Sequence, residues 1–473
     1  MSSFAPHVDD RCSQDDCSGA AIARFRCVEH LAYGELVDAL AQTPEGPLDV
    51  RDTVISANGL QRLLRAHSIA GARPVLPAVN FSGVEFSARA DFAGVTFNDA
   101  ASFRGARFRG EACFEGALFR KNADLTSAAF DRYGKLGPFV VMEHLVLDDA
   151  LFAERITIEV AAAAVSARGA KFAGGVLLRV GHAELGLDDV DFARASTVSG
   201  VGWADTNHVF LSAFHALEAD RGWLGIVRHQ PRLITLRGSQ VAALSLSDVD
   251  LHAARYLGAH GLEALSVEAS CSWPNGPSGR HHVGRETVAE EHFWRMSTRR
   301  YHWTWRSKTA AVPAWLNNRD GPTVLAADQI ASVYRALRKA REDDKDEAGA
   351  SDLYYGEMEM RRHCARTRSD RAILSLYWAL SGYGLKSARA LATLAALIVL
   401  FSFGLQSWGF TSDPPFMRAL LYSVESTSSL FRTPESGGWK ITYAGEAMQI
   451  ALRVLGPILL GLVFLAVRAR VKR

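Results

Sequence analysis

The sequence predicts a mainly β protein, a coiled solenoid with helical segments, that ends in two membrane-spanning helices. Two observations carry this prediction. Bulky apolar residues, nearly all phenylalanine, recur at alternating steps of five and six, and two uncharged apolar segments lie near the C-terminus. The averages hide both features, because 53 basic and 51 acidic side chains leave a formal charge of +2 and 48 % of residues are hydrophobic. These averages exclude a disordered chain and a strongly basic nucleic-acid binder.

The repeat begins near residue 79 and has a unit of eleven residues. Glycine recurs every eleven residues from Gly83 to Gly116, and a small or β-branched residue stands two positions before each bulky one. Neither the 3.6-residue period of a helix nor the two-residue alternation of a strand explains a step of five. A coil in which the chain turns a corner every five residues explains this spacing. The bulky positions are Phe81, Phe86, Phe92, Phe97, Phe103, Phe108, Phe114, Phe119, Leu125 and Phe130.

The pattern continues at a spacing of twenty residues, which is four faces or one full coil. Phe152, Phe172 and Phe192 keep this register, and a third stretch steps by five from Leu236 to Tyr256. The pattern resembles the pentapeptide-repeat family, whose members fold as a right-handed quadrilateral β-helix. The alternative is a β-sandwich in which the phenylalanine spacing is accidental.

The chain divides into six parts by composition and pattern. A solenoid needs its first coil covered by an atypical cap, which we place directly before the repeat. The segment 334–363 resembles one found in membrane-tethered pentapeptide proteins of actinobacterial type. The expected parts are a zinc knuckle (1–35), an N-terminal cap (36–78), the β-helix (79–270) with an insertion at 199–231, a Pro-, Trp- and Arg-rich linker (271–322), a helical pair with an interfacial segment (323–384) and a transmembrane hairpin (385–473).

Two C-terminal segments are long and apolar enough to cross a membrane, which takes about 20 residues. Residues 390–408 contain no charge, and residues 454–467 contain none and extend back to 447 past Arg453. We expect spans near 388–410 and 447–467. The alternative is two buried helices of a soluble domain.

Basic residues flank both spans on the same side. They are Arg361, Arg362, Arg366, Arg368, Arg371, Lys386 and Arg389 before the first span, and Arg468, Arg470, Lys472 and Arg473 after the second. Basic excess marks the cytoplasmic side. The sequence therefore predicts a multi-pass protein of the cell membrane with both termini and the β-helix in the cytoplasm. Residues 372–380 are expected to lie in the membrane interface as a collar.

Cys12, Cys17, Cys27 and His30 have the spacing C-x4-C-x9-C-x2-H. Three thiolates and one imidazole satisfy tetrahedral zinc, and a closed set of four ligands indicates a structural site. A cytoplasmic location keeps the thiols reduced. The spacing resembles small actinobacterial C…C…CxxH knuckles, but has one CxxH pair and one wider gap. The alternative is a loose tail that binds nothing in particular.

No enzymatic motif is present: the chain lacks a P-loop, G-x-S-x-G and H-E-x-x-H. The pairs Asp148-Asp149 and Asp188-Asp189 fall at repeat corners, where aspartate favours turns. The repeat carries nearly equal numbers of acidic and basic residues, so DNA mimicry and nucleic-acid partners are not expected. We predict a non-enzymatic, membrane-anchored scaffold that presents a cytoplasmic surface for protein binding, with the hairpin offering a route to homo-oligomers.

A competing prediction is a two-span pore-loop ion channel regulated by the cytosolic β-helix. Residues 416–431 form an amphipathic stretch between the two spans, the order found in such channels. Thr427, Ser428, Ser429 and Leu430 stand where those channels have the T-V-G-Y-G filter, whose carbonyls replace a cation's water. Glu425 would form a charged ring in an oligomer.

Overall fold

The computed structural model describes residues 11–23, 26–42, 46–68, 73–201, 230–276, 285–297, 325–412, 414–428 and 439–471. They fall into two compact units. The first comprises Met1–Leu325 with Lys339–Asp344, and the second comprises Ala326–Arg338 with Lys345–Arg473. Residues 202–229, most of the expected insertion, lie outside the described part of the chain.

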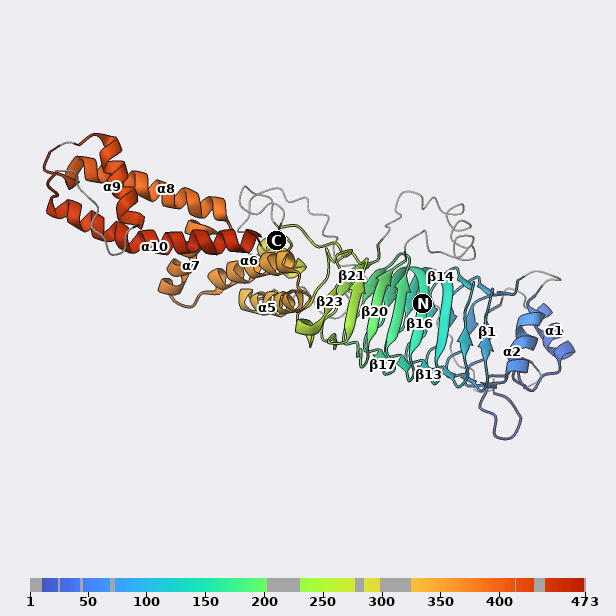
Figure 1. Cartoon of the computed structure of the whole chain (residues 1–473). Helices are drawn as coiled ribbons and strands as arrows, with labels where there is room; N and C mark the ends of the chain where they lie inside the picture. The colour runs from blue at the N-terminus through green and yellow to red at the C-terminus, as the bar shows by residue number, and fades with distance from the viewer. Residues whose placement is uncertain are drawn as a thin grey trace. The chain divides into compact units, whose positions relative to one another are not determined.

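A parallel β-solenoid of about eight turns makes up most of the first unit (Figure 1). This confirms the predicted fold class. Its strands are β1 (Leu48–Asp49), β2 (Val54–Ile55), β3 (Val75–Leu76), β4 (Val79–Asn80), β5 (Glu85–Phe86), β6 (Ala90–Asp91), β7 (Thr96–Phe97), β8 (Ala101–Ser102), β9 (Arg107–Phe108), β10 (Ala112–Cys113), β11 (Leu118–Phe119), β12 (Ala123–Asp124), β13 (Ala129–Phe130), β14 (Gly134–Val146), β15 (Leu151–Phe152), β16 (Ile156–Ser166), β17 (Lys171–Phe172), β18 (Val176–Val180), β19 (Glu184–Gly186), β20 (Ser196–Gly200), β21 (Arg232–Thr235), β22 (Leu244–Ser247) and β23 (Ser266–Val267).

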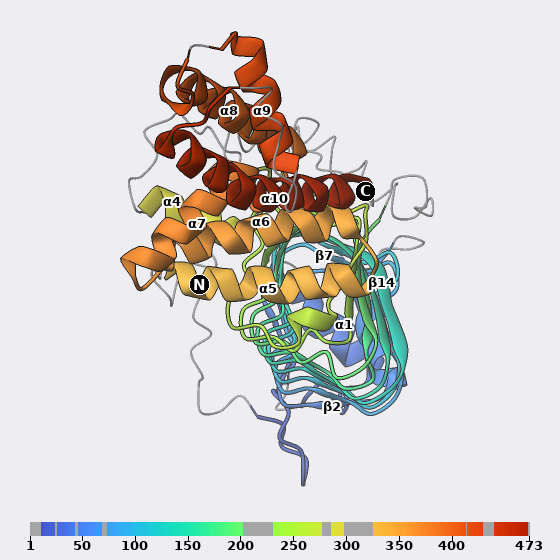
Figure 2. The ribbon, with the colours of Figure 1, turned by 60° about the vertical axis from the view of Figure 1, so that its left-hand side comes forward.

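Strand pairing fixes the length of each coil. Glu85 pairs with Arg107, and Arg107 with Ala129, so each of these coils consists of two of the predicted eleven-residue units. Leu151 pairs with Lys171, and Ile156 with Val176, so the later coils are shorter and consist of four faces of five residues each. The coils stack in register, as the turned view of the solenoid shows (Figure 2).

Phenylalanine side chains fill the solenoid and stack from coil to coil. The rings of Phe86 and Phe108 lie 4.8 Å apart and those of Phe108 and Phe130 lie 4.6 Å apart, with interplanar angles of 13° and 6°. The stack continues to Phe152 at 4.8 Å from Phe130. Aromatic pairs at such distances add about 0.5–1.5 kcal/mol to the gain from burial. The predicted phenylalanine spacing therefore corresponds to continuous stacks in the core.

One corner of the coil uses the left-handed backbone conformation throughout. Gly105 (φ 65°), Ser127 (57°), Asp149 (57°), Gly169 (66°) and Asp189 (54°) occupy it in successive coils. Only glycine adopts this conformation without cost, and aspartate tolerates it better than most residues. This explains both the regular glycines and the placement of the Asp pairs at corners.

Residues before the repeat join its first coil. Two helices, α1 (Tyr33–Gln42) and α2 (Ala57–Ala66), flank β1 and β2, and Leu48 pairs with Val79 while Val54 pairs with Glu85. The hydroxyl of Ser56 caps α2 by accepting from the Gly59 N–H at 3.1 Å. The expected cap region thus supplies strands as well as helices.

The far end of the solenoid carries a short 3-10 turn, η3 (Leu262–Ala264), and the helix α4 (Ala289–Ser297). The side chains Glu290, Glu291 and His292 of α4 are buried. In the range where composition predicts a linker, residues 285–297 are therefore folded. Composition missed this because the segment's charges pair with one another inside the unit.

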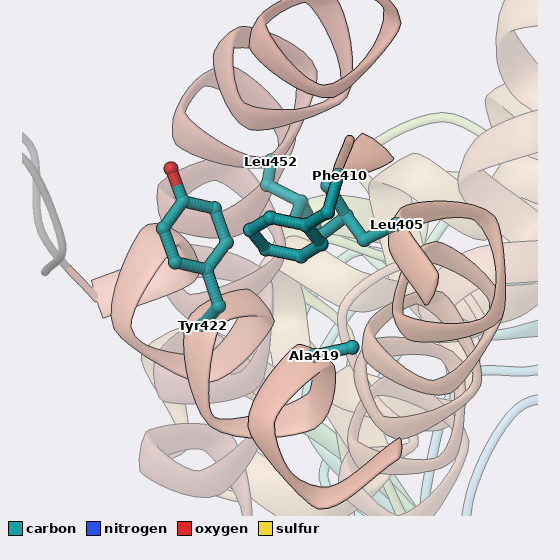
Figure 3. Close-up of a cluster of buried hydrophobic side chains, with 5 residues drawn as sticks. All are labelled: Leu405, Phe410, Ala419, Tyr422 and Leu452. Carbon is teal, nitrogen blue, oxygen red and sulfur yellow. The ribbon is translucent and has the colours of Figure 1, made fainter. Parts of the chain in front are cut away.

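The second unit is helical. Its elements are α5 (Ala327–Asp343, whose last turn belongs to the first unit), α6 (Glu347–Cys364), α7 (Arg368–Ser381), α8 (Ser387–Gly404), the π-helical turn η4 (Leu405–Gly409), α9 (Phe416–Ser428) and α10 (Tyr443–Val471). A small core formed by Leu405, Phe410, Ala419, Tyr422 and Leu452 joins η4, α9 and α10 (Figure 3). The two expected apolar helices are present, as Ser387–Gly409 and Tyr443–Phe464.

Candidate metal centre

Two tight turns bring the four predicted metal ligands together in the N-terminal head. The backbone N–H of Cys12 donates to the carbonyl of Gly19 (2.9 Å), which folds residues 12–19 back on themselves. The N–H of His30 donates to the carbonyl of Cys27 (3.1 Å), which brings these two side chains together. The spacing C-x2-H encodes the second turn directly.

The ligand atoms of Cys12, Cys17, Cys27 and His30 all lie within 4.8 Å of one another. The Nδ1 of His30 is 3.4 Å from the Sγ of Cys12 and 3.2 Å from the Sγ of Cys27. The two sulfurs of Cys17 and Cys27 are 3.7 Å apart. Tetrahedral zinc, with bonds of about 2.3 Å to sulfur and about 2.0–2.1 Å to nitrogen, separates its ligands by about 3.8 Å and 3.6 Å. The cluster therefore has the composition and size of a site that holds a metal ion.

The thiols of the cluster differ in acidity. Burial, with a smaller contribution from the neighbouring Cys17 thiol, outweighs two backbone hydrogen bonds and raises the pKa of Cys27 to about 12. Burial also raises the pKa of Cys12, but hydrogen bonds to the backbone of Gln14 and Cys27 and to the side chains of His30 and Cys17 outweigh burial and lower it to about 6. Cys12 thus ionises before Cys27.

Hydrogen bonds attach the head to the first coil. The N–H of Ala20 donates to the carbonyl of Arg51 (3.0 Å), and the hydroxyl of Ser18 donates to the carbonyl of Asp52 (2.9 Å). A Cβ at Gly19 would collide with the hydroxyl of Thr53, so glycine permits this close approach.

A second set of contacts joins the cluster to α2. Glu29, between two of the ligands, accepts from the hydroxyl of Ser56 (2.7 Å), the residue that caps α2. The guanidinium of Arg62 donates to the carbonyls of Leu31 (2.8 Å) and Glu29 (3.0 Å). The four candidate ligands and the start of the solenoid therefore form one structure.

Comparison with known families agrees with the solenoid geometry. Residues 81–129 match the family described as Pentapeptide repeats (9 copies). The chain is a pentapeptide-repeat protein. No curated protein and no solved structure matches it.

Opposite charges pair across the coils of the pentapeptide-repeat solenoid. Arg107 contacts Asp131 at 3.0 Å, Arg109 contacts Glu85 at 3.1 Å, and Lys121 contacts Asp99 at 2.6 Å. Such exposed pairs are screened by water and add little stability. Their effect is to keep the surface close to neutral, unlike the dense acidic face that DNA mimicry requires.

The Asp pairs at the corners bond within the coils. Asp148 accepts from the backbone N–H of Arg168 (3.0 Å), and Asp188 accepts from the hydroxyl of Thr235 (2.6 Å). Burial raises the pKa of Asp188. These contacts are those of turn residues that join neighbouring coils.

The two apolar helices expose most of their surface. Only 22 % of the most apolar window of each is buried. In α8, Leu400 is 68 % exposed, and in α10, Phe464 is 68 % exposed. A buried core helix of a soluble domain would show the opposite distribution.

The short helix α9 contains the described part of the expected pore-loop segment. Ser423 and Ser426 on α9 are buried, and the hydroxyl of Ser402 on α8 donates to that of Ser423 (3.0 Å). Gly456 on α10 lies so close to Thr427 that a Cβ would be 2.7 Å from its methyl group. Glu425 is exposed. Residues 429 and 430 of the expected filter segment lie outside the described residues.

The buried polar groups of α4 were not predicted from the sequence. Glu291 accepts from Arg285 (3.0 Å) and Arg295 (2.7 Å), and Glu290 accepts from the backbone of Leu257 (3.2 Å). The local signal was a glutamate with an arginine at a helical spacing of four, which also occurs on exposed helices.

Proposed function

We propose that this pentapeptide-repeat protein is a non-enzymatic scaffold anchored in the cell membrane by α8 and α10. The observation that supports it best is the exposure of large apolar side chains along both helices, joined in one chain to a regular, rigid solenoid. Exposure of large apolar surfaces to water is unfavourable, whereas their burial in the hydrocarbon core of a bilayer is favourable. The excess of basic residues around the start of α8 and the end of α10 supports cytoplasmic termini.

The solenoid would present the interaction surface. Its outward side chains are fixed by stacked coils and its charges are balanced, which favours a protein partner over nucleic acid. The absence of an enzymatic motif in the sequence supports a role in binding rather than catalysis.

The N-terminal cluster is proposed to hold a structural zinc ion. Four ligand atoms at tetrahedral separations leave no open position for a substrate. The bound ion would tie the head to the first coil, because the ligands lie next to residues that bond to the turn between β1 and β2 and to Ser56, which caps α2.

Protease access in oriented vesicles tests the anchored scaffold. The proposal predicts that the solenoid is digested in inside-out vesicles and protected in intact cells, and that the protein resists extraction by alkaline carbonate. Cleavage of the solenoid in intact cells would overturn the orientation, and release by carbonate would overturn the anchor.

A second function, a two-span ion channel, is favoured by one observation. The helix α9 packs against both α8 and α10, and its buried Ser423 accepts a hydrogen bond from Ser402 of α8. Reconstitution into liposomes with an ion-flux readout separates the two functions. Flux that is lost in Glu425→Ala, while Arg418→Gln keeps it, would establish the channel; absence of flux from inserted protein would support the scaffold.

A further inference from the structure

The helix α7 carries one packed apolar face and two exposed apolar side chains outside that face. On the packed face, Leu374, Tyr377 and Trp378 pack against a small buried cluster of the second unit. Outside this face, Ile373 is 65 % exposed and Leu376 is 59 % exposed. A helix of a soluble protein turns one apolar stripe to the core and a polar face to water. Ile373 and Leu376, the exposed apolar stripe of α7, therefore favour another apolar environment.

The inner side of α7 is held firmly. Two guanidinium groups contact the ring of Trp378, that of Arg362 at 4.8 Å and that of Arg389 at 5.0 Å from the ring centre. Its Nε1 donates to the hydroxyl of Tyr355 (2.9 Å). With this side fixed, α7 does not rotate to bury Ile373 and Leu376.

A tight turn joins α7 to the first apolar helix. Gly382, Tyr383 and Gly384 all have positive φ, of 55°, 60° and 76°. A tyrosine is strained in this conformation. The hydroxyl of Tyr383 donates to Glu359 on α6 (3.1 Å), and this bond and the burial of the ring hold the turn in place.

Two hydrogen bonds fix the position of the end of α7 along the axis of α8. The guanidinium of Arg389 donates to the carbonyl of Trp378 (2.9 Å), and the hydroxyl of Thr393 donates to the carbonyl of Leu380 (3.1 Å). Thr393 lies about 9 Å along α8 from its first residue, at 1.5 Å per residue. The end of α7 thus lies beside the first two turns of the apolar helix, where the membrane would begin.

Exposed positive charge accompanies the apolar stripe. Arg366, Arg368 and Arg371 are exposed at the start of α7, and the one acidic residue among them is Asp370. Basic side chains next to a membrane helix attract anionic lipids, which are enriched in the cytoplasmic leaflet.

We propose that α7 is an interfacial helix that binds anionic lipid. Ile373 and Leu376 enter the acyl boundary of the leaflet, and Arg366, Arg368 and Arg371 bind the negatively charged headgroups. This inference rests on the proposed anchoring by α8 and α10. It adds a lipid class and a second contact that fixes the second unit against the bilayer surface.

Depth-dependent quenching in nanodiscs tests the proposal on the full chain. An environment-sensitive fluorescent amino acid is placed at position 373, or at position 400 in the exposed part of α8, and nitroxide lipids quench it at two depths. We expect shallow nitroxides to quench the probe at 373 and deep nitroxides to quench that at 400. Absence of quenching at 400 would contradict the membrane anchor itself. Quenching at 400 without quenching at 373, as a second copy covering the stripe would give, would overturn the role of α7 alone.

The lipid class is tested by composition. Adding phosphatidylglycerol to phosphatidylcholine should raise quenching at 373 by about twofold, because each basic residue near the surface favours anionic lipid. Replacing Arg366, Arg368 and Arg371 together by glutamine should remove this difference. Arg418→Gln, between the two spans, is the matched control and should leave it intact. Equal quenching in both lipid mixtures would overturn the binding of anionic headgroups.

Discussion

The carboxylate of Glu290 accepts a hydrogen bond from the backbone N–H of Tyr256. Elsewhere in the solenoid such an N–H donates to a carbonyl of the next coil, as that of Leu236 does to Arg255 (2.8 Å). Tyr256 belongs to the last coil, and in the described part of the chain no further coil follows it. The side chain of Glu290 therefore takes the place of a backbone carbonyl and closes the end of the solenoid, an edge that would otherwise invite pairing with another chain.

Removing this acceptor should loosen the last coil. Glu290→Ala leaves the buried N–H groups of Tyr256 and Leu257 without an acceptor, at a cost of about 2 kcal/mol. Hydrogen exchange at these two amides should then accelerate about thirtyfold. Glu290→Gln keeps an acceptor oxygen and is the matched control with a smaller effect. Equal exchange rates in the wild type and the alanine variant would contradict the capping role.

The acid stability of the same end should depend on His292. Burial lowers the pKa of His292 to about 4. The folded chain therefore binds this proton less readily than the unfolded chain, so the stabilisation is present above pH ~6.5 and is lost as pH falls toward 4. The loss amounts to about 3 kcal/mol, from a difference of about 2.5 pKa units.

Denaturation of wild type and His292→Gln at a series of pH values measures this effect. Burial raises the pKa of Glu290, which acts in the opposite direction because that stabilisation is lost as pH rises. The difference between the two proteins isolates the histidine. A difference that does not change between pH 7 and pH 4 would contradict a buried neutral His292.

Metal removal should disturb the first coil as well as the head. The purified protein is expected to contain one zinc per chain, and a chelator or Cys27→Ser should remove it. Because the N–H of Ala20 donates to the carbonyl of Arg51 and the N–H of Ser56 donates to the carboxylate of Glu29 (3.2 Å), exchange at these two backbone amides should accelerate too. Cys113→Ser, outside the cluster, is the control. Purified protein that contains no zinc, and whose amide exchange does not change on chelator treatment, would contradict the proposed metal site.

The phenylalanine stack should dominate the stability of the early coils. Phe108 lies between Phe86 and Phe130 and is fully buried, so Phe108→Ala should cost about 3–5 kcal/mol. Arg104→Ala breaks only an exposed ion pair with Asp124 and should change stability by less than about 1 kcal/mol. Similar losses for both variants, measured by denaturant unfolding, would show that the stack is not the main source of stability.

The spacing of apolar residues alone predicts the coil, because each face buries one large and one small residue and this pattern recurs about every five positions. It also predicts the shortening of the later coils, because the spacing from Phe108 to Phe130 is wider than that from Phe152 to Phe172. The C-x2-H turn likewise brings Cys27 and His30 together from local geometry. These features depend on contacts that repeat or lie close in sequence.

Other features depend on contacts between residues that are distant in the sequence and follow no repeat pattern. The acceptor role of Glu290 arises because, among the described residues, no strand of a further coil lies beside Tyr256, and no local pattern marks this. The turn at Tyr383 requires a glutamate on another helix, Glu359. The long strands β14 and β16 run through corners that the five-residue pattern places within them. Tertiary context decides each of these.

The two coil lengths also determine how this solenoid changes size. Deleting the segment 87–108 removes one whole coil of two eleven-residue units and leaves every later strand facing its proper neighbour. The shortened solenoid would lose one strand spacing, about 4.8 Å. Beyond Phe152 the same operation must remove a shorter segment, such as 153–172, because Leu151 pairs with Lys171. The solenoid can thus lengthen or shorten only by whole coils, and a whole coil contains more residues in the earlier part than in the later part.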